Sequence, residues 1–480
     1  MRIQYRRGFV LLALAILILL AAPGCGTEMI VYPLTVIGDV QQVIEYDCSA
    51  DLKPTMIGGT KHWAVALADV LDKAGAEDLH KLTFIGIDDH SATVEVADLT
   101  GSFLGWDDNK GWYFVSESYP INTHIKQIRQ IIVQCENASG LAMIGIERNY
   151  QTITAGTFLS ESHHLYIHEE GSTAREYEGS TYRGSSMSRH IVRPVNELVP
   201  GSAKVVKAVA KDGSIHNLSR DNYIEAWGNS FYLNRFDHST RIALTGIIID
   251  PPERMITDLY EDVLNLIDQN KQVLVVMLDG FSYQLYEKAV QEHLAPNLLA
   301  GANVEKAMSV FPPITPCGLA AMLTGQLPAL NGIGSRDDRV LAIPCLLDAL
   351  TERGKTGLII TGTVFPLQLE GEVILNADIN SNQSSDDEVL VQALACLNEG
   401  YDLIFVHFKD LDRSGHTYGP LAEQTCRTLM KLDKYLRELY TAWPGSRILL
   451  TDHGMHQTNE GGHHGQFRYE DLIVPYIIYD

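Results

Sequence analysis

The C-terminal half of the chain contains an apolar run, Leu403-Ile404-Phe405-Val406, that leads into the polar sequence Asp410-Leu411-Asp412-Arg413-Ser414-Gly415-His416. An uninterrupted apolar run of this kind is typical of a strand buried on both faces of a parallel sheet. Carboxylates and an imidazole follow where that strand ends, and these groups bind borderline cations such as zinc. The segment therefore predicts an α/β sheet with a cation-binding edge.

The same alternation of apolar and amphipathic stretches extends in both directions, from Lys271 to the end of the chain. The predicted strands are Val273–Leu278, Gly357–Thr361, Asp402–Phe408, Ser446–Thr451 and Val474–Tyr479, and the predicted helices include Leu341–Arg353, Asp386–Asn398 and Leu421–Tyr440. Fully apolar strands that alternate with helices predict a doubly wound, mostly parallel sheet over residues 271–480. In such sheets ligands bind at the carboxyl ends of strands.

Metal-ligating residue types follow three of the predicted strands. Asp279 ends the first strand, and Asp412 and His416 are placed so that a turn at Gly415 could direct both onto one ion. The full candidate set is Asp279, Asp412, His416, Asp452, His453 and His464. Each has a structural alternative, such as a helix cap or a hydrogen-bonded surface histidine. Together they predict a dinuclear centre, which needs about three ligands per ion.

A candidate nucleophile lies in the sequence Phe311-Pro312-Pro313-Ile314-Thr315-Pro316. Proline suits the first position of a helix, so Pro316 predicts a helix that has Thr315 as its N-cap. Backbone N–H groups at a helix N-terminus help to hold an anionic phosphate, and a hydroxyl on a divalent cation can attack phosphorus. The structural alternative is a threonine that only caps the helix.

Taken together, these motifs resemble the alkaline phosphatase superfamily, and most of all its nucleotide pyrophosphatase/phosphodiesterase branch. The matching elements are Asp279, Thr315 nine residues before Thr324-Gly325, Asp412 to His416 leading to Gly419-Pro420, Asp452 to Met455, and His464-Gly465. The resemblance covers residues 271–480 and implies an alkaline phosphatase-like fold.

The resemblance also implies roles for the candidate residues. One divalent ion, zinc or alternatively manganese, would be held by Asp412, His416 and His464. The second would be held by Asp279, Asp452, His453 and the oxygen of Thr315, which is also the implied nucleophile. His463 is the alternative ligand if the histidine of the C-terminal His-Gly motif is the residue before His464.

Two positions bear on the substrate. Sulfatases carry a modified cysteine where this chain has Thr315, and Cys317 lies two residues beyond it, so formylglycine chemistry on sulfate esters is disfavoured. The phosphodiesterase branch carries an asparagine about 21 residues after the nucleophile, and that count leads to Arg336. An arginine there could bind two phosphate oxygens, which would suit a monoester or a phosphonate, or it could be a solvated loop residue.

Residues 26 to about 260 differ from the rest, because short β-rich runs alternate with Gly, Asp, Asn and Ser turns. A faint internal repeat relates Asp69-Val70-Leu71 to Glu197-Leu198-Val199 and the apolar run Ile128–Val133 to Ile242–Ile249. We therefore expect two small β-rich or α+β modules, residues 26–137 and 138–260, before the catalytic domain. They are candidates for binding an unidentified surface partner.

The N-terminus predicts export. A basic region, Met1 to Arg7, precedes an apolar stretch from Gly8 to Ala22 and then Pro23-Gly24-Cys25, which resembles a bacterial lipobox. Residues 1–25 are expected to be a signal segment, with lipidation of Cys25, an uncleaved membrane anchor and plain secretion as the three alternatives. All three place the remaining chain outside the cytoplasm.

Composition restricts the partners. The chain has 480 residues and a formal net charge of −23, which argues against a nucleic-acid polymer as the main partner. Its seven cysteines show no paired CxxC spacing, so neither a zinc ribbon nor a redox motif is indicated.

The sequence and the resemblance lead to one expected function. The chain is expected to be an exported, metal-dependent phosphoesterase that acts through a phospho-threonine intermediate on a small-molecule phosphate ester. The substrate would be a phosphodiester or a pyrophosphate, with monoesters and phosphonates as further options. A phosphoryl or phospho-alcohol transferase on the same scaffold and a non-catalytic surface-binding protein are the alternatives.

Overall fold

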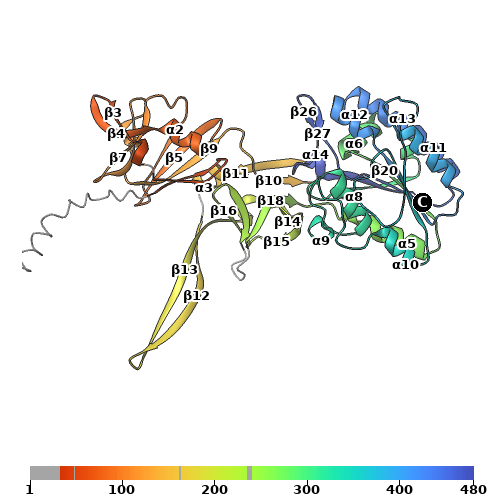
Figure 1. The fold of residues 1–480 in the computed structure, drawn as a ribbon, viewed down its shortest axis with the longest axis horizontal. Coiled ribbons are helices and arrows are strands. Elements are labelled where there is room, and N and C mark those ends of the chain that lie inside the picture. Colours follow the sequence, from red (N-terminus) through yellow and green to blue (C-terminus); the bar gives the residue numbers. More distant parts are fainter. Residues whose placement is uncertain (1–32, 48, 147, 162–163, 235–240, 480) are drawn as a thin grey trace, which may run out of the picture. The chain divides into compact units, whose positions relative to one another are not determined.

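The computed structural model describes residues 33–479, except 48, 147, 162–163 and 235–240 (Figure 1). The chain divides into two compact units, one that ends at Ala138 and one that starts at Ser139. The expected signal segment and Cys25 lie outside the described residues. Within the described ranges, no helix is both long enough and apolar enough to cross a membrane.

The first unit contains two sheets. One has the order β2 (Ile44–Tyr46), β1 (Leu34–Gly38), β9 (Ile128–Cys135), β5 (Leu79–Gly86) and β6 (Ser91–Glu95), and the other β3 (Lys53–Ile57), β4 (Thr60–Ala66), β7 (Ser102–Asp107) and β8 (Gly111–Ser116). Helix α2 (Leu67–Lys73) lies between β4 and β5 in the chain. Buried aromatic residues fill the core, where the rings of Phe84 and Phe114 stack at 4.5 Å.

The first part of the second unit repeats this topology. Strand β10 (Gly140–Gly145) pairs antiparallel with β11 (Asn149–Thr154) and parallel with β18 (Ile242–Ile249). In the same way, β1 pairs antiparallel with β2 and parallel with β9. Likewise β14 (Val206–Ala210) pairs with β15 (Ile215–Leu218) and β18, as β5 pairs with β6 and β9. Helix α4 (Val195–Leu198) occupies the position of α2. The segments that the faint repeat relates therefore occupy equivalent positions.

The repeated part differs by one long hairpin, β12 (His164–Tyr177) and β13 (Ser180–Pro194), which takes the place of β3 and β4 and is exposed over most of its length (Figure 1). Strands β16 (Tyr223–Trp227) and β17 (Ser230–Asn234) join it to β18. At its base the buried carboxylate of Glu225 lies 2.8 Å from Nδ1 of His190 and accepts a 2.8 Å hydrogen bond from Asn234. This network holds the hairpin to the sheet.

The C-terminal part is built on an eight-stranded sheet. Its order is β19 (Arg254–Met255), β21 (Ala302–Met308), β28 (Ile473–Tyr479), β25 (Ser446–Leu450), β20 (Val273–Leu278), β24 (Leu403–Phe408), β22 (Gly357–Thr361) and β23 (Glu372–Leu375). Strand β28 runs antiparallel to β21 and β25, and the other pairs are parallel. The predicted doubly wound, mostly parallel sheet is confirmed.

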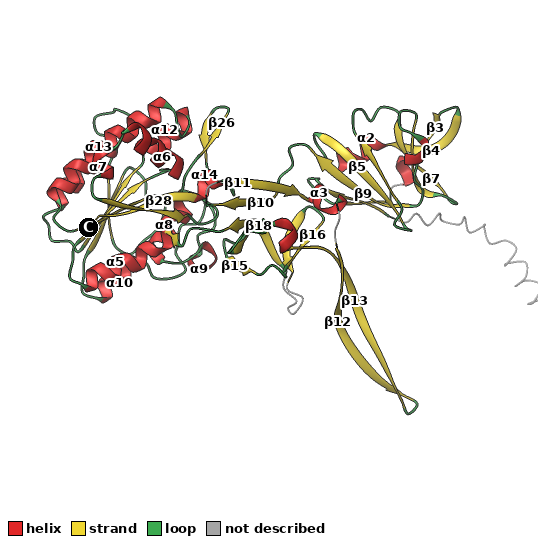
Figure 2. Ribbon diagram, turned by 180° about the vertical axis from the view of Figure 1, so that it is seen from behind, coloured by secondary structure: helices red, strands yellow, loops and turns green. Residues whose placement is uncertain are grey.

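Helices cover both faces of this sheet (Figure 2). Alternate side chains of a strand point to opposite faces, so β20 supplies both cores: Val273, Val275 and Met277 enter one, and Leu274, Val276 and Leu278 the other. The first core includes α5 (Leu259–Asp268), α8 (Thr315–Thr324) and α10 (Leu346–Glu352), and the second α6 (Tyr283–Glu292), α11 (Asp386–Cys396) and α13 (Glu423–Ala442). Burial on both faces explains why β20 is wholly apolar.

Short elements complete the structure: η1 (Ser49–Asp51), η2 (Ile121–Thr123), η3 (Ile256–Asp258), α3 (Ala155–Ser160), α7 (Pro296–Leu299), α9 (Pro328–Asn331), α12 (Asp410–Tyr418), α14 (Tyr469–Leu472), β26 (His456–Thr458) and β27 (Gly461–His463). The helix predicted from Leu341 begins only at Leu346, because Cys345 is its N-cap and the Cys345 N–H donates to Asp348. Within the described ranges, the cysteines at positions 135, 317, 345, 396 and 426 are free thiols.

The repeated module and the eight-stranded sheet share a hydrophobic core. Its buried members are Ile144, Val209, Ile248, Met308, Phe467, Tyr469, Leu472 and Ile473. A side chain at Gly246 would overlap the ring of Phe467, so glycine permits this contact. The side chain of Asn149 also accepts a 2.8 Å hydrogen bond from the Tyr469 N–H and donates a 2.9 Å bond to Glu470. Residues from 139 onward therefore fold as one unit.

Candidate metal centre

The register of the central strands brings the predicted ligands together. Leu278 of β20 lies opposite Phe408 of β24, and Met277 lies opposite Leu450 of β25. The residues that follow each strand therefore emerge side by side at the carboxyl edge of the sheet, as expected for a ligand site in this architecture. Asp279, Lys409 and Asp452 occupy these positions.

Asp412 and His416 lie on a helix, not on the turn that their spacing around Gly415 suggested. Helix α12 starts directly after β24, and residues four apart on a helix share one face. Oδ1 of Asp412 accordingly lies 3.4 Å from Nε2 of His416. Gly280 has a φ of 74°, and a side chain there would meet Asp412 at 3.1–3.2 Å. Glycine at 280 thus lets this helix approach the end of β20.

The hydroxyl of Thr315 is available for chemistry. Helix α8 has Ile314 as its N-cap, so Thr315 is the first helical residue and the predicted N-cap is wrong by one position. No side chain caps this helix, and Oγ1 of Thr315 lies 3.3 Å from Nε2 of His453. Proline is tolerated throughout the first turn, which is why Pro316 did not fix the register. The Thr315 hydroxyl is therefore not used as a helix cap.

A glycine one turn later holds this helix against the site. A Cβ at Gly318 would lie 2.6 Å from Cβ of Asp452 and 2.9 Å from its Cα, closer than any side chain allows. Glycine inside a helix costs about 0.5–1 kcal/mol relative to alanine. The close contact offsets that cost, because it places the start of α8 beside Asp452.

Three histidines are oriented in the same way. Nδ1 of His416, His453 and His464 lies 2.9, 2.9 and 3.0 Å from the backbone carbonyls of Gly462, Gly454 and Pro313, respectively. A ring that donates through Nδ1 to a carbonyl keeps its lone pair on Nε2, the usual arrangement of a metal-bound histidine. The rings of His453 and His464 stack at 3.7 Å, so their Nε2 atoms serve one small volume.

Those Nε2 atoms face carboxylate oxygens that accept no hydrogen bond. Nε2 of His453 lies 3.3 Å from Asp452 and 3.5 Å from Asp279, and Nε2 of His464 lies 3.6 Å from Asp412. Buried carboxylate oxygens without a hydrogen-bond partner occur on these three aspartates and, elsewhere in the described chain, on Asp387 and Glu388. Unpaired oxygens that face imidazole lone pairs are the donor set of a cation site.

Burial shifts the pKa of each group toward its uncharged form. It raises the pKa of Asp279 well above its ordinary value, and the carboxylates of Asp452 and Asp412 raise it further. It also raises the pKa of Asp412 to about 6. Burial lowers the pKa of His453 to about 3 and that of His464 to about 2. The imidazoles are therefore neutral at pH 7, and the carboxylates ionise together only with a cation between them.

The ligand atoms form two overlapping groups: Asp279, Asp452 and His453, and Asp412, His453 and His464. The first is the set that the resemblance implied for one ion. In the second, His453 takes the place expected for His416, whose Nε2 lies 3.4 Å from Asp412 but belongs to neither group. His463, the alternative ligand, is exposed and belongs to neither group. The residues present fit divalent metal ions, and the division of ligands between two ions stays a prediction.

Two residues near these ligands had escaped the sequence analysis. His407 is fully buried, with Nε2 2.9 Å from Oδ2 of Asp279 and Nδ1 3.2 Å from the Thr361 hydroxyl. Burial lowers the pKa of His407, so the neutral ring can donate to Asp279 and orient it. A polar residue inside the apolar run Phe405-Val406-His407-Phe408 was the available signal. The other missed residue is Lys409, directly after this strand.

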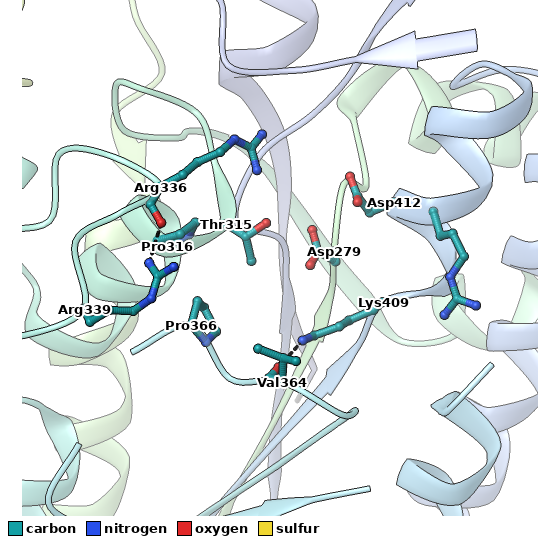
Figure 3. A pocket seen from close by; sticks show the side chains of 10 residues that line it. Asp279, Thr315, Pro316, Arg336, Arg339, Val364, Pro366, Lys409 and Asp412 are labelled. Atoms are coloured by element: carbon teal, nitrogen blue, oxygen red, sulfur yellow. Dashed lines mark hydrogen bonds between the residues drawn. The ribbon is translucent and has the colours of Figure 1, made fainter. Parts of the chain in front are cut away.

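A pocket of about 480 Å³ opens beside the ligands (Figure 3). It is lined by Asp279, Thr315, Pro316, Arg336, Arg339, Val364, Pro366, Lys409, Asp412 and Arg413. The Thr315 hydroxyl and the Asp279 carboxylate face each other at its centre (Figure 3). Arg336 lies beside Thr315, with Nη2 3.5 Å from Nε2 of His464, although much of its side chain is exposed. The predicted nucleophile Thr315, two of the predicted ligands, Asp279 and Asp412, and Arg336 therefore border one volume.

Neutralising one carboxylate should separate metal binding from folding. Asp452→Asn keeps the oxygen that accepts from the Gly280 N–H, but it removes a negative charge beside Asp279 and Asp412. The metal-free variant should therefore melt no lower than metal-free wild type. With zinc at 100 times Kd, wild type should gain about 2.7 kcal/mol, or about 4 °C, and the variant less than about 2 °C. Thermal melts with chelator or zinc measure both; an equal zinc effect in the two proteins would contradict the site.

Comparison with known proteins agrees with this geometry. A family model described as type I phosphodiesterase/nucleotide pyrophosphatase matches residues 273–340 and 368–475. The catalytic subunit of human GPI ethanolamine phosphate transferase 2 is 25% identical in an alignment that covers 45% of this chain and 23% of that protein.

Two solved structures are also similar. Phosphonoacetate hydrolase from Sinorhizobium meliloti 1021, bound to phosphonoformate, has 18% identity and a TM-score of 0.33 over 38% of this chain and 56% of its own. Murine ectonucleotide pyrophosphatase/phosphodiesterase 5 has 17% identity and a TM-score of 0.33 over 40% and 59%. The chain spans less than two thirds of each of these relatives. The family match covers most of residues 271–480, and the predicted similarity of this domain to type I phosphodiesterases/nucleotide pyrophosphatases is confirmed.

Proposed function

We propose that the chain is a metal-dependent phosphoric ester hydrolase that uses Thr315 as its nucleophile. The observation that carries this proposal is the placement of an uncapped Thr315 hydroxyl 3.3 Å from His453, among buried carboxylates that lack hydrogen-bond partners. The family match supports a phosphoesterase-type enzyme. Two divalent cations, zinc or manganese, would be held by Asp279, Asp412, His416, Asp452, His453 and His464.

The chain's own residues account for the reaction. Bound cations would lower the pKa of the Thr315 hydroxyl and offset charge on the attacking and leaving oxygens. The hydroxyl proton passes to solvent, the Thr315 oxygen bonds to phosphorus, and the bond from phosphorus to the leaving-group oxygen breaks. Water then cleaves the phospho-threonine and restores the hydroxyl. The first turn of α8 begins at Thr315, so its free backbone N–H groups would help to hold the phosphoryl oxygens.

Removing the nucleophile should abolish turnover while leaving the metal site in place. Thr315→Ala should lower kcat by about 1,000-fold or more, because no other hydroxyl lies at this position. Thr417→Ala is the matched control: this exposed threonine is on α12 and its hydroxyl donates to the Arg413 carbonyl. A panel of nitrophenyl monoester, diester and phosphonate substrates, with and without chelator, measures the effect. Activity that survives in Thr315→Ala, or that ignores the chelator, contradicts the mechanism.

Arg336 should set the preference for charge on the phosphoryl group. A guanidinium beside Thr315 can bind two oxygens of a dianionic monoester or phosphonate, whereas an asparagine donates to one. Arg336→Asn should therefore reduce kcat/KM for a nitrophenyl monoester by about 10-fold or more relative to the diester. An unchanged monoester-to-diester ratio would show that Arg336 acts only as a solvated loop residue.

A phospho-alcohol transferase is the second candidate, and the similarity to the human ethanolamine phosphate transferase favours it. The two activities share the phospho-threonine and differ in whether water or an alcohol accepts the group. Product analysis with added alcohols distinguishes them. A transferase would give a ratio of alcohol ester to hydrolysis product that exceeds the molar ratio of alcohol to water. The third alternative, a non-catalytic protein, is disfavoured because no ligand position has been lost.

We also propose that the protein is exported. The basic and apolar N-terminal segments and Cys25 support an exported, lipid-anchored protein, with an uncleaved anchor or secretion as the alternatives. Labelling cells with a radioactive fatty acid would mark wild type but not Cys25→Ala; equal labelling contradicts lipidation at this residue. The extracellular partner expected for the two β-rich modules stays a prediction.

A further inference from the structure

The hairpin of β12 and β13, residues 164–194, extends well beyond the sheet that carries it and is called the arm below (Figures 1 and 2). Among the described strands, β16 pairs with the arm, and only at Val192–Pro194. From Glu169 to Met187 every residue is exposed, so no described part of the chain covers either face of this stretch. A two-stranded hairpin without a third strand or a packed face is marginally stable in water.

Strand β12 is the last strand of its sheet, so its outer backbone groups have no strand partner in the described chain. It has 14 residues and contains neither the prolines nor the lysines that protect many exposed edges. The bulge at Glu170 interrupts the edge, but the stretch from Gly171 to Tyr177 pairs regularly with β13. The other edge of the hairpin, along β13, is occupied by β16 at its base. Strand β12 is therefore a template for a further strand.

Apolar side chains lie along the same hairpin. Leu165 and Ile167 on β12 and Met187 on β13 are each 57% exposed. Their cross-strand neighbours place all three on one face, because Ile167 lies opposite Arg189 and Met187 lies opposite Glu169. This row of exposed apolar residues adds a hydrophobic contribution to any pairing along the edge.

The arm differs in charge from the rest of the protein. It contains four glutamates and four arginines, so its formal net charge is zero, whereas the whole chain carries −23. Two copies of so acidic a chain repel each other, and the arm adds nothing to that repulsion. The arm is therefore a surface through which two copies can meet.

Several charges of the arm are not paired within the chain. Glu169 accepts a 2.8 Å hydrogen bond from Ser185. In the described part of the chain, however, Glu169, Glu170 and Arg183 have no oppositely charged group within the 4.0 Å of an ion pair. Unpaired charges of both signs on one exposed edge suit a partner that carries the same pattern in reverse.

The arm itself carries that reversed pattern. Let two copies of β12 run antiparallel about a two-fold axis at Ser172, with the bulge at Glu170 counted as one position. Glu169 and Glu170 of one copy then lie opposite Ala174 of the other. Arg183 is the cross-strand neighbour of Ala174, and the short alanine lets its guanidinium reach over to those carboxylates. The two-fold axis makes this contact occur twice.

We propose that β12 pairs with β12 of a second copy of this chain, so that the protein is a dimer joined through its arms. Main-chain hydrogen bonds along the shared edge supply the affinity, as in other strand additions. Tyr166 and Tyr177 of the two copies lie opposite each other at both ends of the paired stretch, and aromatic cross-strand pairs are stabilising. The dimer concerns the arm alone and does not depend on the proposed phosphoesterase activity.

Shortening the arm should produce a monomer. Glu169 lies opposite Met187, so replacing residues 170–186 by Asn-Gly closes the hairpin with a favoured two-residue turn and keeps the contacts of Glu225 at its base. Sedimentation of the full chain in a non-ionic detergent should show a wild-type dimer at about 10 μM. The dimer dissociation constant of the shortened variant should be about 100-fold or more weaker. A cooperative thermal melt shows that this variant is folded.

Charge reversal tests the contact without changing the length of the arm. Arg183→Glu places a further acid beside Glu169 and Glu170 of the other copy and should weaken dimerisation by about 10-fold or more. Adding Glu169→Arg and Glu170→Arg to that variant should restore most of the affinity. Arg175→Glu is the matched control: it makes the same charge change on the opposite face of the arm, which carries no acid, and should alter the dissociation constant by less than about threefold.

Oxidative cross-linking identifies the shared edge. The axis passes beside Ser172, so Ser172→Cys should form a disulfide between two copies. Ser185→Cys is the matched control, because Ser185 lies opposite Ser172 on β13 and is equally exposed. Its two copies would be about 14 Å apart, three strand spacings, whereas a disulfide needs Cα atoms within about 7 Å. Wild type, with its seven cysteines, gives the background.

Each result bears on the proposal. A wild type that is monomeric at about 10 μM overturns it, as does a dimer that persists in both the shortened and the Arg183→Glu variants. Cross-linking of Ser185→Cys as efficient as that of Ser172→Cys shows that β12 is not the shared edge. A monomer whose arm is protected from protease only by a different cell-surface component would replace the second copy by that partner.

Discussion

The central constraint on this domain is electrostatic: three buried carboxylates face imidazole lone pairs, and only a cation between them makes that arrangement favourable. Much of the nearby structure holds these groups in place. Strand register brings Asp279 and Asp452 to one edge, glycines at 280 and 318 allow α12 and α8 to approach, and backbone carbonyls orient each ring. The close-packed sheet beneath, buried on both faces, keeps these positions fixed relative to one another.

The sheet and most of the site could be predicted because their signals are local in sequence. A strand such as Val273–Leu278 is apolar throughout, and an aspartate at its end is visible by inspection. What could not be predicted depends on pairing between distant segments. His407 and Lys409 gain their meaning only when β24 is aligned with β20, and the helix that carries Asp412 replaces the expected turn because α12 begins at once after the strand. The start of α8 was misplaced because proline fits two adjacent positions.

The two β-rich modules illustrate how topology outlasts sequence similarity. Residues 34–135 and 140–249 share the order of their strands and most of the pairing, although β17 pairs with β18 only in the second module, and the sequence repeat between them is faint. Strand pairing needs only alternating side chains of suitable size, so many sequences satisfy it. The long hairpin in the second module shows that the scaffold also tolerates a large insertion at a loop.

The core shared by the repeated module and the catalytic sheet has a practical consequence. A fragment cut at the start of the α/β sheet would leave Phe467, Tyr469 and Met308 facing water, next to the segment that leads from Phe311 into α8. Such a protein would expose an apolar patch that favours aggregation, and the segment before α8 would lose its packing contacts. A shortened protein should therefore start near Ser139, so that the second module keeps its contacts with the α/β sheet.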